Sequence, residues 1–287
     1  MRLFDFLTDP ILRGPTIGVM LMAVSAALVG CLLFVRKRSL IAETLSHATY
    51  PGVTLAAALC TTNLPIWILV GAFISALLGY WAVELLHSRF RVQTDVALTF
   101  VLASFFGIGV TIASLVQNTH TAAFRQIQSY LFGQAATMGD RHIVIYSILS
   151  LVVIASLVIF YRPLFAATFD RSFAKVAGLG QKRTETLLLI LVGLSIVIGI
   201  RSVGVILLSA MFIAPAAAAR QYSDRLSLML VLAAMIAALS GLIGSYFSVV
   251  FSLPTGPVIA LVVGGIALLS LAFSPRRRRV YASLQRS

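Results

Sequence analysis

The sequence predicts an all-α membrane protein, a transmembrane bundle of about nine helical spans, with eight to ten compatible with the pattern. Of the 287 residues 60% are hydrophobic and only 11% charged, whereas a soluble domain carries about 25% charged residues. The mean hydropathy is +1.01. Polar stretches are too short to fold alone, so we expect residues 1–287 to form a single transmembrane domain.

The predicted spans are apolar runs of about 17–23 residues, enough to cross ~30 Å of hydrocarbon. They are 14–35, 40–60, 65–86, 94–116, 142–161, 184–200, 203–219, 226–249 and 257–273. Within the polar connection 117–140, residues 130–133 (YLFG) predict a short interfacial or re-entrant helix. The longest well-charged connection is 162–183, and a basic tail covers 275–287.

The basic residues predict how the chain is oriented. With nine spans and a cytoplasmic C-terminus, 17 of the 22 Lys and Arg residues fall on the cytoplasmic side, as the positive-inside rule requires. The N-terminus is then outside, and 162–183 is a cytoplasmic loop. This distribution also explains the net charge of +13 without a nucleic-acid partner. The tail is expected to bind anionic lipid.

The second span contains the most unusual segment, 39–52, which reads SLIAETLSHATYPG. Glu43 and His47 are four residues apart, so a helix places them on one face. A carboxylate and an imidazole suit a divalent cation such as Zn²⁺ or Mn²⁺. Pro51 and Gly52 predict a kinked or locally unwound helix beside them, lining the path of an ion.

A simpler interpretation of these residues stays open. Glu43 can lie at the water interface, and the His47 imidazole can be hydrogen-bonded to Ser46 or to a backbone carbonyl. Two potential ligands do not by themselves make a metal site. Glu84 and His87, near the end of the third span, offer a similar pair, for which an interfacial role with a nearby arginine is the favoured interpretation.

Six segments in order resemble motifs of one family, the permease subunits of ATP-binding cassette (ABC) importers for zinc, manganese and iron ions. They are 36–52 (RKRSLIAETLSHATYPG), 95–114, 130–133 (YLFG), 169–180 (FDRSFAKVAGLG), 203–218 (VGVILLSAMFIAPAAA) and 244–256 (GSYFSVVFSLPTG). The resemblance covers nearly the whole chain. One departure concerns Glu43, which stands where the family usually has Asp; the longer side chain keeps the carboxylate and leaves the metal preference open.

The resemblance implies a fold, a cargo and partners. It implies the type II ABC importer permease fold in a bacterial plasma (inner) membrane. The chain would carry Mn²⁺, Zn²⁺ or Fe²⁺ into the cytoplasm, with Glu43 and His47 contacting the ion. It would receive the ion from an extracytoplasmic metal-binding protein, and a separate pair of cytoplasmic ATPase subunits would power it. A second permease chain, identical or paralogous, would complete the pore.

The cytoplasmic loop 162–183 contains the candidate contact with the ATPase. Asp170 can cap a helix, Ala174 and Ala177 favour one, and Gly178 can end it. Phe173 adds an apolar side chain to this short amphipathic helix. The resemblance implies that it is a coupling helix docking in a groove of the ATPase. An ordinary solvated connection is the alternative.

Catalysis by the chain itself is not expected. It lacks a Gly-x-x-x-x-Gly-Lys-Ser/Thr loop, so we predict no nucleotide site, no permanently bound cofactor and no enzymatic activity. The main alternative function is a secondary metal transporter driven by an ion gradient. Such carriers often contain inverted repeats with paired broken helices, and the sequence shows one broken span and no evident repeat. A membrane enzyme or scaffold is the third candidate.

Overall fold

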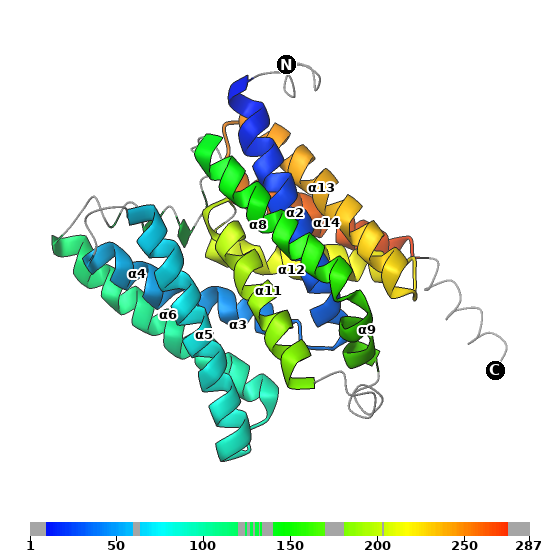
Figure 1. The fold of residues 1–287 in the computed structure, drawn as a ribbon. Helices are drawn as coiled ribbons and strands as arrows, with labels where there is room; N and C mark the ends of the chain where they lie inside the picture. Colours follow the sequence, from blue (N-terminus) through cyan, green and yellow to red (C-terminus); the bar gives the residue numbers. More distant parts are fainter. Residues whose placement is uncertain are drawn as a thin grey trace.

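Helices make up nearly all of the part of the chain that this computed structural model describes (Figure 1). The described residues are 10–59, 64–119, 124, 127–128, 130–131, 133, 140–169, 181–202 and 204–274. No strand occurs among them, which confirms the all-α prediction.

Each predicted span has a helical counterpart among these residues. The helices are α2 (Pro10–Val35), α3 (Leu40–Ala48), α4 (Tyr50–Leu59), α5 (Leu64–Phe90), α6 (Thr94–Thr119), α8 (Asp140–Ile159), α9 (Tyr161–Phe169), α11 (Gln181–Ser202), α12 (Val205–Arg220), α13 (Leu226–Val250) and α14 (Thr255–Ala272). Within the described residues, α2, α5, α6, α13 and α14 contain stretches long and apolar enough to cross a membrane by themselves. The protein is therefore a multi-pass membrane protein.

The helix α2 is the centre of the larger part of the fold. Helices α8, α11, α12 and α13 pack around it (Figure 1), and its side chains Val19 and Met22 are fully buried. Gly30 lets α12 approach closely, because a Cβ there would overlap the carbonyl of Phe212. We call the buried cluster centred on α2, with residues of α3, α8 and α11 to α14 and a few of α5 and α6, the first core.

A smaller cluster, the second core, is centred on α4. It contains Val53 of α4, Ile68 of α5 and Ala113 of α6. Tyr130, from the predicted element 130–133, is buried there as well. Helices α4 and α5 pack nearly backbone to backbone, since a Cβ on Gly52 would overlap the carbonyl of Gly71. The fold thus has two buried clusters, and the second predicted span passes from one to the other.

The structure interrupts the second span near Pro51 and Gly52, as predicted, and corrects the sequence prediction at two other places. The second span is two helices, with the break at Thr49, two residues before Pro51. The third span extends to Phe90, so the connection to α6 is only 91–93. The loop 162–183 begins with the helix α9, in which a buried Leu164 belongs to the first core. Apolar side chains in the predicted connections pack against the bundle, and a hydropathy profile does not show these tertiary contacts.

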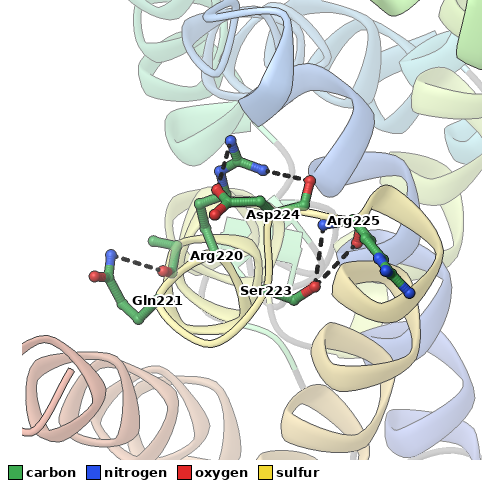
Figure 2. A network of polar contacts seen from close by, with 6 residues as sticks. Arg220, Gln221, Ser223, Asp224 and Arg225 are labelled. Atoms are coloured by element: carbon green, nitrogen blue, oxygen red, sulfur yellow. Dashed lines mark hydrogen bonds and ion pairs between the residues drawn. The ribbon is translucent and has the colours of Figure 1, made fainter. Parts of the chain in front are cut away.

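A network of polar contacts closes the turn between α12 and α13 (Figure 2). Arg220 forms an ion pair with Asp224 at 3.1 Å, and the Ser223 hydroxyl accepts a hydrogen bond of 3.1 Å from the backbone N–H of Arg225. The Ser274 hydroxyl, after α14, donates to the Gln221 side-chain oxygen at 3.0 Å. These contacts hold the ends of three helices together.

Candidate functional site

Glu43 and His47 lie on one face of α3, one turn apart, as predicted. The roughly opposite face, with Ala42 and Leu45, is buried in the first core. Glu43 and His47 are only half-buried, and they are close enough to interact electrostatically. The helix therefore has one buried face and one half-buried face with both ionisable side chains.

The imidazole of His47 has a defined orientation without a hydrogen bond. Its ring meets the Phe106 ring of α6 edge-on, with centroids 5.1 Å apart and an interplanar angle of 87°. Its Nδ1 atom is buried and has no hydrogen-bond partner in the described part of the chain. The Ser46 hydroxyl donates instead to the Ala42 carbonyl, at 2.7 Å. The alternative in which Ser46 holds His47 is therefore wrong, and a buried nitrogen is left without a partner.

Aromatic rings and a glycine form the wall beside this imidazole. Tyr50 packs on Phe106 with centroids 5.5 Å apart. A Cβ on Gly109 of α6 would come within 3.0 Å of the Pro51 nitrogen and overlap the Tyr50 ring. The α6 backbone thus lies directly against the start of α4, and the Phe106 side chain from the same helix packs on the His47 ring.

The break between α3 and α4 is a single residue with helical dihedrals, Thr49, rather than an unwound segment. The hydroxyl of Thr49 donates to the Ser46 carbonyl at 2.5 Å, and Ser75 of α5 donates to the Ala48 carbonyl at 2.6 Å. The Ala48 carbonyl is therefore occupied by a protein donor. Pro51 and Gly52 are buried in the first turn of α4, so these two residues pack against neighbouring helices at the positions where a lining role was predicted.

A cavity of about 150 Å³ lies at the other end of α3. Its lining includes Ile41 of α3, Glu84 and His87 of α5, and Glu185 of α11. The Nδ1 atom of His87 forms a hydrogen bond of 3.0 Å with the Val92 carbonyl. No group of three or more His, Cys, Asp and Glu side chains that could hold a metal ion occurs among the described residues. One chain therefore contributes two candidate ligands at the α3 site, not a complete coordination shell.

The predicted ATPase-coupling residues Asp170, Phe173, Ala174, Ala177 and Gly178 lie outside the described residues, as does the tail 275–287. The helices on either side of the coupling segment are described. Helix α9 ends at Phe169, and α11 begins at Gln181.

Sequence reasoning missed two contributors to this region. Phe106 orients His47 across 59 positions of sequence, and nothing in its local pattern marks it among the apolar residues of α6. Thr168 accepts a hydrogen bond of 3.0 Å from Arg36 Nε, just before α3. The sequence predicts 162–183 as one loop, so it gives no indication that Thr168 lies on a helix that contacts Arg36.

Comparison with known proteins gives a consistent result. Residues 8–274 match the model of the family described as "ABC 3 transport family". A "Probable metal transport system membrane protein" of Chlamydia pneumoniae is 38% identical over 287 residues, which covers 94% of this chain and 64% of that protein. The chain therefore spans less than two thirds of the length of that relative.

Two other matches extend over nearly the full length of both chains. The "Zinc transport system membrane protein TroC" of Treponema pallidum is 36% identical, with 98% of this chain and 94% of that protein covered. The solved structure "PsaBC from Streptococcus pneumoniae in complex with Fab" superposes with a TM-score of 0.86 at 26% identity, covering 98% of each chain. The helical arrangement described above is thus shared with that structure.

Proposed function

Given that the chain belongs to the ABC 3 transport family, we propose that it is the membrane-spanning permease of an ATP-binding cassette importer that carries a divalent transition-metal ion into the cytoplasm. The cargo is Mn²⁺, Zn²⁺ or Fe²⁺. A separate pair of ATPase subunits supplies the energy, and an extracytoplasmic protein delivers the ion. The permease itself holds no nucleotide and no permanent cofactor. The zinc named for the relative from Treponema pallidum supports a cargo of this class.

The observation that carries this proposal is the free face of α3. Glu43 forms no ion pair or hydrogen bond with the described residues, and His47 Nδ1 is buried without a partner. A half-buried carboxylate and imidazole without hydrogen-bond partners among the described residues are costly in a membrane unless they serve a ligand or a cavity. An imidazole favours Zn²⁺, Mn²⁺ or Fe²⁺ over Ca²⁺ and Mg²⁺. Together they form a partial shell for the cargo.

A second permease chain, identical or paralogous, completes this shell. The face of α3 with Glu43 and His47 points away from the first core, and a single chain provides only two ligands. Two chains that meet at this face would provide four, the number that Zn²⁺ takes in protein sites. The pore then lies between the chains, and Pro51 and Gly52 shape it indirectly through the bend of α3 and α4.

The orientation follows from the basic residues. The end of the bundle with residues 36–38 and 91–93 faces the cytoplasm of a bacterium, and the N-terminus faces outward. The segment 170–180, with Asp170 and Phe173, docks on the ATPase there. The basic tail binds anionic lipid of the plasma membrane. A secondary transporter driven by an ion gradient is the competing proposal, and it predicts uptake that continues when the ATPase cannot hydrolyse ATP.

The test is metal uptake by proteoliposomes containing the permease, its ATPase and the binding protein, measured with radioactive Mn²⁺, Zn²⁺ and Fe²⁺ in turn. We expect His47→Ala and Glu43→Gln to reduce ATP-dependent uptake at least tenfold. His87→Ala is the matched control, because its imidazole contacts the Val92 carbonyl outside this site. Equal uptake by wild type and His47→Ala would refute the ligand assignment.

A further inference from the structure

A side-chain hydrogen bond joins the turn between α2 and α3 to α9, which is far away in the sequence. Arg36 Nε donates a hydrogen bond of 3.0 Å to Thr168 Oγ1, across 132 residues. The Thr168 hydroxyl donates in turn to the Leu164 carbonyl at 2.6 Å. Leu164 is only 1% exposed and lies in the first core. The contact therefore joins the last turn of α9 to the residue that precedes α3 by four positions.

The turn itself is rigid, because its backbone hydrogen bonds are complete. Lys37 has a positive φ of 55°, its N–H donates to the Phe34 carbonyl at 3.0 Å, and the Arg38 N–H donates to the Leu33 carbonyl at 2.9 Å. This pattern is a Schellman motif, which ends α2 with a fixed geometry. The Ile41 N–H then donates to the Arg38 carbonyl at 3.1 Å. A displacement of Arg36 is therefore passed to the first turn of α3.

Free volume lies beside this first turn. The cavity of about 150 Å³ is lined by Arg38 and Ile41 on one side and by Glu84 and Glu185 on the other. A smaller cavity of about 20 Å³ adjoins Arg36 and Arg38. Close-packed interiors resist movement, so these cavities mark the place where the start of α3 can shift without compressing side chains.

At the far end of the contact, α9 leads directly into the segment 170–180. Figure 1 shows the last turn of α9 beside the lower end of α2. Helix α9 also packs against α11, the helix that follows this segment. A displacement of α9 therefore reaches Arg36 through the hydrogen bond from Arg36 to Thr168.

We propose that the hydrogen bond from Arg36 to Thr168 transmits a displacement of α9, driven by the ATPase, to α3, and so to Glu43 and His47. This inference rests on the proposed function, because it assumes that an ATPase acts on 170–180. Arg36 and Thr168 are positioning residues in this scheme. They do not touch the transported ion; they move the helix whose side chains do.

The test compares transport with ATP hydrolysis in proteoliposomes of the full complex. The variants are Thr168→Val, which keeps the size of the side chain and removes the hydroxyl, and Thr168→Ser, which keeps the hydroxyl. Metal binding by the detergent-solubilised permease is measured in parallel with Mn²⁺ or Zn²⁺. We expect Thr168→Val to bind metal within about twofold of wild type and to lower the number of ions transported per ATP at least fivefold. Thr168→Ser restores the wild-type ratio.

A second variant, Arg36→Gln, removes the guanidinium from the other side and is expected to lower the same ratio. If Thr168→Val fails to fold, the same ratio is measured for Arg36→Gln instead. The inference would be overturned if a folded variant kept the wild-type number of ions transported per ATP, even where transport and ATP hydrolysis both fall in proportion. The proposed function fails separately: it is refuted if uptake continues when the ATPase cannot hydrolyse ATP. The link alone is refuted if uptake requires ATP hydrolysis and Thr168→Val stays fully coupled.

Discussion

The two cores of this protein differ in what surrounds them. In α2, at the centre of the first core, 67% of an 18-residue apolar window is buried inside the chain, against 33% in α5 and 28% in α6 beside the second core. The outer helices of the first core, α13 and α14, are each 33% buried as well, so both cores leave apolar faces for lipid or for another chain. The difference is that the first core has a central helix that is mostly enclosed.

The candidate site lies where the two cores meet. Helix α3 belongs to the first core and α4 to the second, and Thr49 separates them. Among the candidate membrane spans of the described residues, α2 is the most enclosed, so we expect substitutions that disturb its packing to cost the most stability. Under the proposed function, we expect substitutions at the junction of α3 and α4 to affect uptake more than stability.

The largest effect is expected in the first core, at Gly30. A Cβ there would overlap the carbonyl of Phe212, and backbone cannot rotate away as a side chain can. We expect Gly30→Ala to lower the stability of the protein by about 3 kcal/mol, measured as the thermal unfolding midpoint and yield of monodisperse protein in detergent. Gly264→Ala is the control, because no atom lies within 4 Å of the added methyl group. Equal behaviour of both variants would contradict the assigned packing.

A smaller effect is expected for the corresponding change in the second core. In Gly52→Ala the methyl group would overlap the Gly71 carbonyl, but α5 has an exposed outer face toward which it can shift. We expect a loss of about 2 kcal/mol, together with a loss of uptake larger than stability alone explains. The control is Gly107→Ala in α6, which has open space. Wild-type uptake by Gly52→Ala would show that the junction tolerates separation of α4 and α5.

The pH dependence of metal binding tests the site at the junction of α3 and α4 separately from the two cores. Only the neutral imidazole of His47 can bind a metal, so binding is complete above the range in which the imidazole titrates and is lost as pH falls through it. Below that range we expect metal affinity of the isolated permease to fall about tenfold per pH unit, or ~1.4 kcal/mol. Isothermal titration calorimetry in detergent measures it, and His87→Ala should give the same curve. A flat profile would remove His47 from the ligand set.

A moderate effect is expected for the hydrogen bond that secures the junction. Ser75→Ala removes the donor to the Ala48 carbonyl, a buried contact of 2.6 Å. Leaving that carbonyl unsatisfied costs about 1 kcal/mol, which thermal unfolding detects. Ser88→Ala, which removes an exposed hydroxyl bonded within α5, serves for comparison. The interpretation is wrong if the exposed substitution destabilises as much as the buried one.

The smallest effect belongs to the turn shown in Figure 2. The side chains of Arg220 and Asp224 are 25% and 65% exposed, and exposed ion pairs contribute about 0–1 kcal/mol. We expect Asp224→Asn to change stability by less than about 0.5 kcal/mol and to leave uptake unchanged. Unfolding at 0.05 M and 0.5 M salt should show that even this difference disappears at the higher ionic strength.

Much of this description could be predicted from the sequence. The spans followed from apolar runs long enough for a bilayer, and Glu43 and His47 were marked by their charge and their spacing of four, which any helix converts into a shared face. The sequence also places the break within one turn before Pro51, because proline interrupts a helix there and is tolerated in the first turn of the next one. The hydrogen bond from Ser75 to the Ala48 carbonyl and the packing of Gly52 on Gly71 could not be predicted, because they join separate helices.

Hydropathy and helical periodicity are local properties, so they are enough to predict a multi-pass helical protein with an acid and an imidazole on one side of a helix. The buried side of α3, the contact of Phe106 with the imidazole and the hydrogen bond from Arg36 to Thr168 depend on the tertiary structure. These contacts join residues distant along the chain, and their partners are selected by the packing of whole helices rather than by neighbouring residues.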